Sequence, residues 1–406
     1  MNHTDQPTPR LRTTWGDLDL TRFPEDPRDR LRAWDAADAY LLRRLAADGT
    51  GLTGSVVVVG DRWGALGTAL AGAPGCAPVL ISDSYLGQRA TAANLERAGH
   101  TGARLLTTQD APPDRIDVLI VRVPKSLALL EDQLHRLRPA LHEGTVVVGT
   151  GMVKEIHTST LKLFERIIGP TRTSLAEQKA RLIFTTPDLA PSAGSPGSPG
   201  SPGPNPWPHS YRLPDDVGVL AGRTVVNHAG VFCAEHLDIG TRFFLQHLPD
   251  RSGARRIVDL GCGNGVVGTS AALTHPDAEI LFTDESHQAV ASARATYAAN
   301  AGDRPGDAVF RVGDGLAEAE PESVDLVLNN PPFHSHQATT DATATRMFAQ
   351  ARAALAPGGE LWVVGNRHLG YHVKLRRLFG NSELVASDPK FVVLKAVKRP
   401  SRRGGA

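Results

Sequence analysis

Four residues of the first half of the chain recur in the second half at one constant offset of 201 positions. They are Gly60, Gly64, Gly67 and Asp83, which correspond to Gly261, Gly265, Gly268 and Asp284. In each half the glycines follow an apolar run that is typical of a buried strand, and the aspartate ends the next run. A repeat of this length exceeds the roughly 20–50 residues of a solenoid unit. The pattern therefore predicts a duplicated domain.

Both halves alternate short apolar runs with helical patterns. In the first half we predict strands at 55–59, 79–83, 117–123 and 145–149, with helices at 31–47, 86–98 and 127–141. In the second half we predict strands at 257–260, 279–284, 310–314, 324–328 and 360–365, with helices at 289–300 and 344–355. Strands that alternate with helices favour a parallel sheet covered on both faces. The expected fold class is therefore α/β, with two tandem Rossmann-like domains, each a doubly wound and mostly parallel sheet.

A Ser-Pro-Gly-rich stretch at 191–209 separates the two halves. Such a segment buries too little apolar surface to fold by itself, so we interpret it as a linker. The predicted organisation is a first domain at 1–190, this linker, a second domain at 210–399 and a basic tail at 400–406.

The composition restricts which partners and which cellular compartment we expect for the protein. A formal net charge of +1 predicts no global attraction to nucleic acid, so any basic surface must be local. The three cysteines form no Cys-x-x-Cys pair, which suggests neither a disulfide framework nor a metal site and fits a reducing compartment. No apolar run approaches the roughly 20 residues that a membrane span needs. We therefore expect a cytoplasmic protein without membrane or metal partners, and we expect a monomer.

The turn after the strand at 257–260 carries the predicted cofactor chemistry. Glycines let the backbone turn sharply and approach a ligand, and the N-terminus of the next helix favours a carboxylate. Asp284 is placed to accept hydrogen bonds from ribose hydroxyls, and Asp314 to accept one from an adenine amino group. A nucleoside with an amino-acid tail matches this set, which predicts S-adenosyl-L-methionine as the cofactor. The expected cofactor-binding residues are Asp259, Gly261, Gly263, Asn264, Gly265, Asp284, Asp314 and Asn330.

A dinucleotide is the alternative ligand for the same turn, because glycines 263, 265 and 268 also fit a Gly-x-Gly-x-x-Gly fingerprint. The segment after the strand at 324–328 decides between the two. Asn330 and Pro331 offer two carbonyl acceptors at the carboxyl end of a strand, and Phe333 offers a ring that can stack on a flat substrate. These groups suit a planar exocyclic amine and have no use in hydride transfer. The expected catalytic residues are Asn330, Pro331, Pro332 and Phe333.

On these residues the second half resembles class I methyltransferases that act on nitrogen. The whole chain outside the linker resembles the RlmG family of 23S ribosomal RNA guanine-N2 methyltransferases, sisters of the small-subunit RsmC enzymes. Apart from the glycine turn, the resemblance is carried by residues 34–38, 123–125, 157–161, 237–244, 330–334, 365–371 and 390–398. It implies 23S rRNA as the partner, either protein-free or in an early assembly intermediate. The linker and Cys233-Ala234-Glu235 depart from the family pattern.

Three other functions stay open. A 16S rRNA guanine-N2 methyltransferase and a protein glutamine N5-methyltransferase would use the same Asn-Pro-Pro chemistry, and a non-catalytic RNA-binding scaffold would keep only the fold. The paired domain and the basic tail argue against a glutamine substrate. The intact acids and Asn330 argue against a scaffold.

The first half lacks this chemistry. Asp61-Arg62-Trp63 interrupts its glycine turn, and Arg122-Val123-Pro124-Lys125 stands where the second half has Asn330 to Phe333. We expect a non-catalytic copy whose Arg122 and Lys125 hold RNA phosphates, with a purely structural copy as the alternative. In the second half, a group of cations around one aromatic ring suits looped RNA. Its members are Arg367, His368, Tyr371, His372, Lys374, Arg376 and Arg377.

Overall fold

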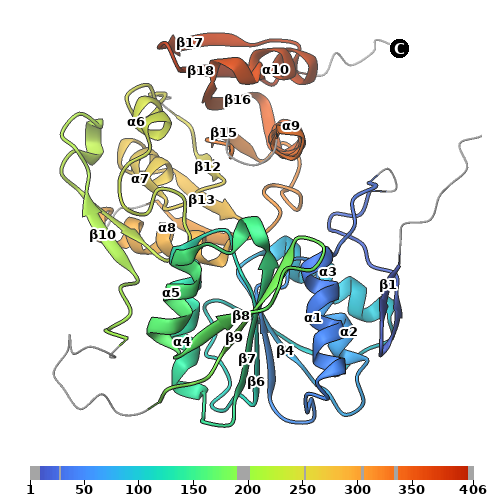
Figure 1. Ribbon diagram of the computed structural model, residues 1–406. Helices are drawn as coiled ribbons and strands as arrows, with labels where there is room; N and C mark the ends of the chain where they lie inside the picture. Colours follow the sequence, from blue (N-terminus) through green and yellow to red (C-terminus); the bar gives the residue numbers. More distant parts are fainter. Residues whose placement is uncertain are drawn as a thin grey trace, which may run out of the picture. The chain divides into compact units, whose positions relative to one another are not determined.

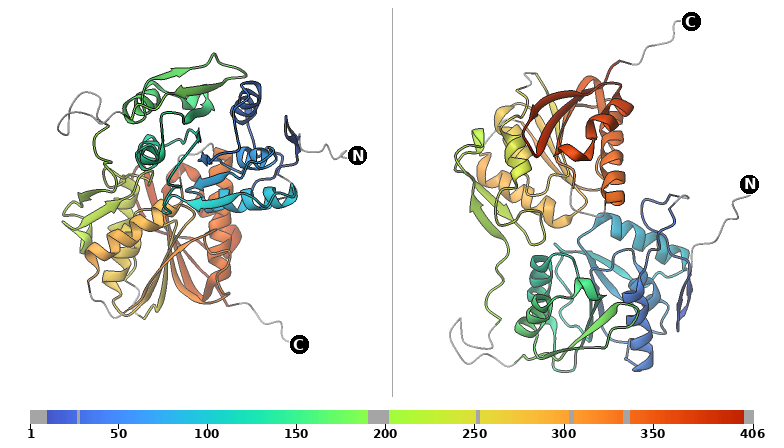
Figure 2. Two further views of the ribbon diagram at one scale, coloured as in Figure 1. Left: turned by 90° about the horizontal axis from the view of Figure 1, so that it is seen from below. Right: turned by 45° about the horizontal axis from the view of Figure 1, so that its top comes forward.

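The computed structural model describes residues 10–26, 29–189, 202–250, 253–302, 306–332 and 337–400, with the side chains of 337–341 excepted. The chain forms two compact units, Met1–Pro206 and Trp207–Ala406. Each unit contains one seven-stranded sheet with helices on both faces (Figures 1 and 2). None of the helices in the described ranges is long and apolar enough to cross a membrane.

The sheet of the first unit has the strand order β5-β4-β3-β6-β7-β9-β8. Its five parallel strands are β3 (Val56–Val59), β4 (Val79–Ser82), β5 (Arg104–Thr107), β6 (Val118–Arg122) and β7 (Val146–Met152). Two antiparallel strands, β9 (Ala180–Thr185) and β8 (Thr171–Thr173), complete one edge. A separate hairpin joins β1 (Leu11–Thr13) to β2 (Gly16–Leu18).

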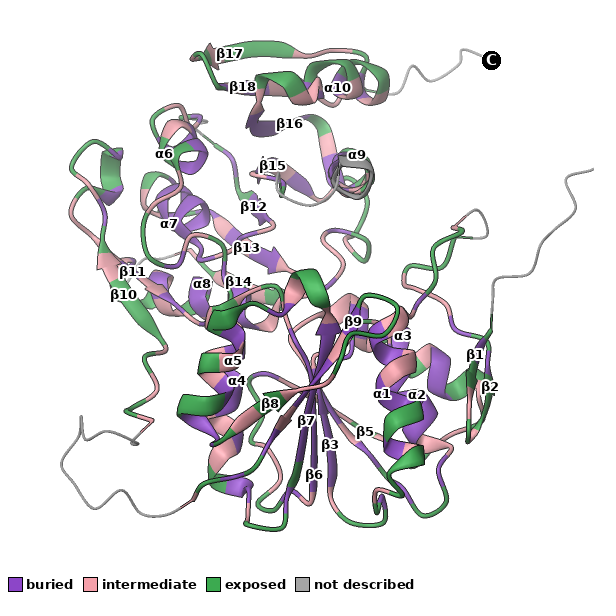
Figure 3. Cartoon of the chain, in the orientation of Figure 1, coloured by how far each residue is buried: buried purple, intermediate pink, exposed green. Residues whose placement is uncertain are grey.

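Helices cover both faces of this sheet. Helices α1 (Ala36–Ala47) and α2 (Ala65–Ala71) pack into one apolar cluster with β3, and α3 (Tyr85–Arg97) contributes to the same side. Helices α4 (Leu127–Leu137) and α5 (Thr158–Ile167) pack into the other cluster. Figure 3 shows that the central strands between them are buried, as the continuous valine run of β3 requires.

The second unit repeats the first, with strand order β14-β13-β12-β15-β16-β18-β17. Its parallel strands are β12 (Arg256–Leu260), β13 (Glu279–Asp284), β14 (Ala308–Val312), β15 (Val324–Asn329) and β16 (Leu355–Asn366). The antiparallel strands are β18 (Phe391–Val397) and β17 (Glu383–Ser387). A hairpin of β10 (His209–Arg212) and β11 (Thr224–Asn227) precedes them. The equal strand orders confirm the predicted fold class of two tandem Rossmann-like domains.

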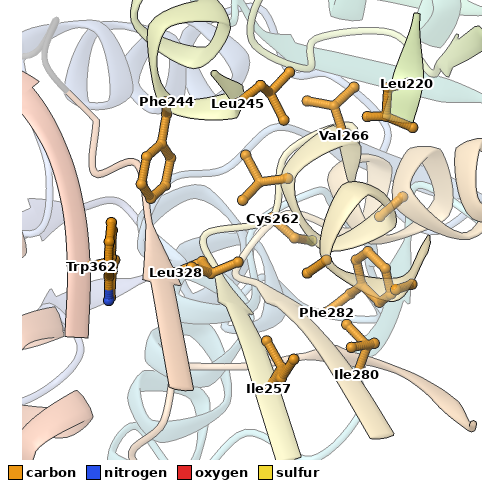
Figure 4. Packing of buried hydrophobic residues seen from close by; sticks show 14 of the residues in the cluster. Leu220, Phe244, Leu245, Ile257, Cys262, Val266, Ile280, Phe282, Leu328 and Trp362 are labelled. Carbon is orange, nitrogen blue, oxygen red and sulfur yellow. The ribbon is translucent and has the colours of Figure 1, made fainter. Parts of the chain in front are cut away.

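Two apolar clusters flank the second sheet. Helices α6 (Ile239–Leu245), α7 (Val266–Thr274) and α8 (His287–Asn300) pack on one face, and α9 (Gln337–Ala354) and α10 (Tyr371–Phe379) on the other. In Figure 4, Phe244 of α6 points towards Leu328 of β15, beside Trp362 of β16. This packing fixes α6 against the strand that ends in the predicted catalytic segment.

Several predicted element bounds were inexact. Helix α1 begins at Ala36 and not at 31, because Asp35 caps it and exchanges hydrogen bonds with Ala37 and Asp38. Helix α9 begins earlier than predicted, at Gln337. Strand β5 was missed, because this strand is partly exposed and has no continuous apolar run. Strand β14 ends at Val312, so Asp314 lies in the loop after the strand.

Candidate cofactor and substrate site

The glycine turn leads from β12 into α7 at the centre of the second sheet. Here the neighbours β13 and β15 lie on opposite sides of β12, which is the point where open α/β sheets bind ligands. Gly265 caps α7 with φ +76, and a Cβ there would lie 2.6 Å from the Cα of Ala293. Gly263 has φ +52, and a Cβ there would meet no described atom within 4 Å. The turn is therefore packed at Gly265 and open at Gly263.

Asp284 stands beside the open part of this turn. One carboxylate oxygen accepts a hydrogen bond from Gly263 N at 3.0 Å, and the other accepts one from Ser286 N at 3.0 Å. The side chain is half-buried at the carboxyl end of β13. Asp284 thus ties the turn to the neighbouring strand and presents a carboxylate at the expected ribose position.

Asp259 lies beneath the turn. It is 3% exposed, and its carboxylate accepts a hydrogen bond from Gly268 N at 2.7 Å. Burial raises the pKa of Asp259 to about 8, although the Gly268 hydrogen bond opposes the shift. Its described contacts give Asp259 a structural role in holding α7 against β12.

Asp314 lies in the loop after β14, and helix α9 fixes this loop. Arg346 donates a hydrogen bond to the Asp314 carboxylate at 3.0 Å. Gln350 donates to Asp314 O at 3.1 Å and accepts from Leu316 N at 3.2 Å. Asp314, the predicted adenine acceptor, therefore forms an ion pair with Arg346, which the sequence did not predict.

Asn330 directly follows β15. Its amide nitrogen donates to the Thr241 hydroxyl at 2.9 Å, and its Oδ1 is buried without a hydrogen-bond partner within the part of the chain that the structure describes. The preceding Asn329 is fully buried and donates to Leu260 O at 2.7 Å, which joins β15 to β12 next to the glycine turn. Pro331 is buried and Pro332 is exposed. Phe333 lies outside the described residues.

The structure adds two polar groups from the β10–β11 hairpin. Asn227 is fully buried, and its Oδ1 accepts a hydrogen bond from Nδ2 of Asn264 at 3.0 Å. The Nδ2 of Asn227 is buried and has no hydrogen-bond partner among the described residues, and the buried hydroxyl of Tyr211 faces the side chain of Asn264. Burial, followed by the nearby Cys233, raises the pKa of Tyr211 to about 12, so this phenol remains a donor. Nothing in the local sequence marks these residues as site residues.

These groups fit S-adenosylmethionine. The open face at Gly263 leaves room for the backbone to approach a ligand. Asp284 at the end of β13 and Asp314 in the loop after the adjacent β14 are two acceptors at the same edge of the sheet. Close to the turn, Asn227 Nδ2 is a buried donor without a partner among the described residues, and the Tyr211 hydroxyl is a second buried donor that faces Asn264. An amino-acid carboxylate needs donors of this kind. Among the described residues, no group of three or more His, Cys, Asp or Glu could hold a metal ion.

The corresponding place in the first unit is filled by charged side chains. Arg122 is 1% exposed and contacts three carboxylates: Asp35 at 2.6 Å, Asp38 at 3.1 Å and Glu155 at 3.1 Å. Asp61 is buried and accepts a hydrogen bond from Gly67 N at 2.8 Å. The expectation that Arg122 holds an RNA phosphate is wrong, because its guanidinium is buried and paired. Lys125 is exposed.

The predicted RNA-contacting group on α10 also needs a correction. Tyr371 is 2% exposed, and its ring packs against Phe348 with centroids 5.3 Å apart. The expectation that Tyr371 belongs to an RNA-contacting group is therefore wrong. The exposed members of that group are Arg367, His368, His372, Arg376 and Arg377.

Two family models match the chain, the RLMG N-terminal domain over residues 8–189 and the methyltransferase small domain over residues 222–395. The ribosomal RNA large subunit methyltransferase G of Streptomyces avermitilis is 72% identical over 391 residues, 96% of this chain and 99% of that protein. The chain belongs to the RlmG family. An RlmG protein of Pseudomonas aeruginosa is 48% identical over 96% of this chain and 100% of its own length. The predicted family is therefore confirmed.

A solved structure shares the tandem fold of this RlmG family member. It is the T. thermophilus 16S rRNA N2 methyltransferase RsmC in complex with AdoMet and guanosine. The match has a TM-score of 0.70 at 22% identity and covers 96% of this chain and 97% of that one. At this identity the likeness shows the fold alone.

Proposed function

We propose that this protein transfers a methyl group from S-adenosylmethionine to the exocyclic N2 of a guanine in 23S rRNA. Its curated relatives are named as large-subunit ribosomal RNA methyltransferases and match over nearly their whole length. The observation that carries the reaction is the Oδ1 of Asn330, a buried acceptor beside the glycine turn that has no hydrogen-bond partner among the described residues. A buried polar atom without a partner costs about 1–3 kcal/mol, so a donor from the substrate has a reason to bind there.

The proposed chemistry needs acceptors more than it needs a base. The lone pair of the guanine amine is delocalised into the ring. Asn330 Oδ1 and the Pro331 carbonyl would accept hydrogen bonds from its two N–H groups and favour a pyramidal nitrogen, whose localised lone pair can point at the methyl group. Bound S-adenosylmethionine supplies the electrophilic methyl group. The amine would gain this methyl as the S–CH3 bond breaks, S-adenosylhomocysteine would leave as a neutral thioether, and the amine would release one proton to water. Positioning supplies most of the acceleration, up to roughly 7–11 kcal/mol in favourable cases.

The remaining roles follow the same geometry. Pro332 and Phe333 would line the pocket for a base that has left its stack. The cofactor would be held by Gly261, Gly263, Asn264 and Gly265 of the turn and by Asp284 and Asp314. Asp259 would hold the turn from below, and Tyr211 and Asn227 would receive the cofactor carboxylate.

We assign the first unit a non-catalytic role, because a paired arginine stands where the second unit has its acceptor. Lys125 of the first unit and the exposed cations near α10 would hold RNA phosphates. We further propose that the protein acts in the cytoplasm as a monomer, on protein-free 23S rRNA or an early assembly intermediate.

The first test is transfer of labelled methyl from S-adenosylmethionine to protein-free 23S and 16S rRNA, followed by nucleoside analysis. We expect N2-methylguanosine in 23S rRNA only. Label in 16S rRNA would mean that the substrate is the RNA of the small subunit. The absence of label from both, with the cofactor still bound, would reject an rRNA substrate in this form.

The second test addresses Asn330 itself. The Asn330→Ala variant should lose about 10²-fold in single-turnover rate, the scale of one lost hydrogen-bond partner in a transition state, and should bind the cofactor normally. Asn300→Ala is the matched control, because within the described ranges its amide donates only to the backbone oxygens of Thr224 and Thr296, at 2.7 and 2.6 Å. Equal rates in the two variants would exclude the proposed role of Asn330.

A further inference from the structure

Asn330 is connected through Thr241 to a carboxylate. Asp238 caps α6, and its Oδ2 accepts hydrogen bonds from Thr241 N at 2.8 Å and from the Thr241 hydroxyl at 3.1 Å. The same hydroxyl accepts a hydrogen bond from Asn330 Nδ2 at 2.9 Å. Three side chains from α6 and the end of β15 thus form one continuous chain of hydrogen bonds.

The single proton of the Thr241 hydroxyl determines the direction of this chain. A hydroxyl donates once and accepts twice. Asp238 can only accept while ionised, so the Thr241 proton points at Asp238. Thr241 can then only accept from Asn330, which requires the NH₂ group of the amide on that side. The Oδ1 of Asn330 must therefore face away from α6, where it has no partner among the described residues.

We propose that Asp238 and Thr241 are positioning residues that lock the Asn330 amide with its oxygen towards the substrate amine. This inference rests on the proposed function of Asn330. A flipped amide would present two N–H donors to a substrate group that is itself a donor. The hydrogen bonds that connect Asp238, Thr241 and Asn330, here called the amide lock, therefore exclude this flipped orientation. The carboxylate also polarises the hydroxyl and the amide in series, which strengthens Oδ1 as an acceptor.

The packing of α6 holds this lock at a fixed distance from β15. Phe244 is fully buried against the sheet, next to Trp362 (Figure 4). Gly240 lies so close to β18 that a Cβ there would be 2.9 Å from Cε1 of Phe391. Helix α6 therefore cannot shift along the sheet without breaking these contacts. Thr241 and Asn330 lie 89 positions apart in the sequence, and only tertiary packing brings their side chains together.

A simpler role for Thr241 would be to complete the cap of α6. The two roles differ in what they require of the side chain. Capping needs the Asp238 carboxylate and the backbone N–H of Thr241, and Thr241→Val keeps both. The amide lock needs the hydroxyl, which Thr241→Val removes and Thr241→Ser retains.

The test measures single-turnover methylation of protein-free 23S rRNA, cofactor affinity and urea unfolding for the full chain. Thr241→Val should slow methyl transfer about 10-fold or more, the scale of one hydrogen bond to a reacting group, with cofactor affinity within about 2-fold of the parent. Thr241→Ser should restore the rate to within about 3-fold. Thr296→Val is the control, because its buried hydroxyl forms hydrogen bonds, among the residues that the structure describes, only with Val226 N and O, at 3.0 and 3.1 Å. Its loss should affect stability and leave the rate unchanged.

A double-mutant cycle separates this proposal from the proposed function. In the Asn330→Ala background, Thr241→Val should cause no further loss of rate, because the lock has nothing left to orient. Independent, additive losses would overturn the lock, as would a normal rate for Thr241→Val in the parent. If Asn330→Ala itself methylates normally, the function assigned to Asn330 fails first.

Discussion

Arg122 and Asn330 occupy equivalent positions in the two sheets. In the first unit Val59 pairs with Val121 across β3 and β6, and in the second Leu260 pairs with Asn329 across β12 and β15. The next residue is Arg122, the last of β6, in the first unit and Asn330, which directly follows β15, in the second. At this position the second unit thus has an acceptor without a partner in the described part of the chain, and the first unit has a buried cation held by three carboxylates.

Removing the cation should destabilise the first unit severely. Arg122→Met leaves the side chains of Asp35, Asp38 and Glu155 without their shared partner, and breaking a buried ion pair typically costs about 3–5 kcal/mol. Urea unfolding measures the loss. Arg43→Met is the control, because Arg43 pairs with Glu177 on an exposed surface and should cost less than about 1 kcal/mol. Equal losses would mean that water already solvates the Arg122 cluster.

The two glycines of the cofactor turn should respond differently to alanine. Gly265→Ala places a Cβ 2.6 Å from backbone of α8 and strains a left-handed residue, so we expect loss of folded protein. Gly263→Ala meets no described atom, so it should cost only about 1–2 kcal/mol of backbone strain while weakening cofactor binding. Urea unfolding and calorimetric titration with S-adenosylmethionine separate the two effects. Unchanged cofactor affinity in Gly263→Ala would argue against a ligand at that face.

Asp284 and its repeat counterpart Asp83 offer a matched pair for the cofactor assignment. Asp284→Ala removes the acceptor of Gly263 N and the expected ribose acceptor, so the dissociation constant of S-adenosylmethionine should rise about 10–100-fold. Asp83→Ala removes an acceptor of the Thr108 hydroxyl in the first unit and should leave cofactor affinity unchanged. A comparable loss in both variants would show that the first unit contributes to cofactor binding.

The sequence allowed prediction of the features that depend on local pattern. The valine run of β3, the glycine turn after β12 and the Asn-Pro-Pro end of β15 each lie within one short segment, and the structure has a strand or a turn at each. The 201-residue offset predicted the shared topology, because duplicated domains keep their strand order.

The features that sequence reasoning missed depend on partners far away in the chain. Asp35 lies 87 positions before Arg122, so the local segment Arg122 to Lys125 looked like a free basic patch. Tyr371 was expected to meet RNA, but its ring packs against Phe348 of another helix. Arg346 and Asp314 are 32 positions apart, and only the fold brings them together. Tertiary pairing of charges has no signature in a single sequence.

The pH dependence of stability should reveal Asp259. Its folded pKa of about 8 is raised by burial above the unfolded value of 3.8. The protonated carboxyl therefore contributes stability to the folded state that is fully present below pH 4. As the pH rises from 4 through 8, this contribution is lost by up to about 1.4 kcal/mol per pH unit. Asp259→Asn keeps an acceptor for Gly268 N and has no proton to lose. The variant should therefore gain stability relative to the parent between pH 5 and pH 8, as measured by urea unfolding without cofactor.

Asp61 provides the parallel case in the first unit. Burial and, second, the charge of Asp38 raise the pKa of Asp61 to about 7. Asp61→Asn should therefore also gain stability relative to the parent as the pH rises, and this gain should level off near pH 7. The second unit should show no such change in this variant, because Asp61 belongs to the first. A gain that is constant with pH in either variant would mean that the parent aspartate is already ionised at pH 5. The carboxylate would then be solvated or paired more strongly than its buried position beneath the glycine turn implies.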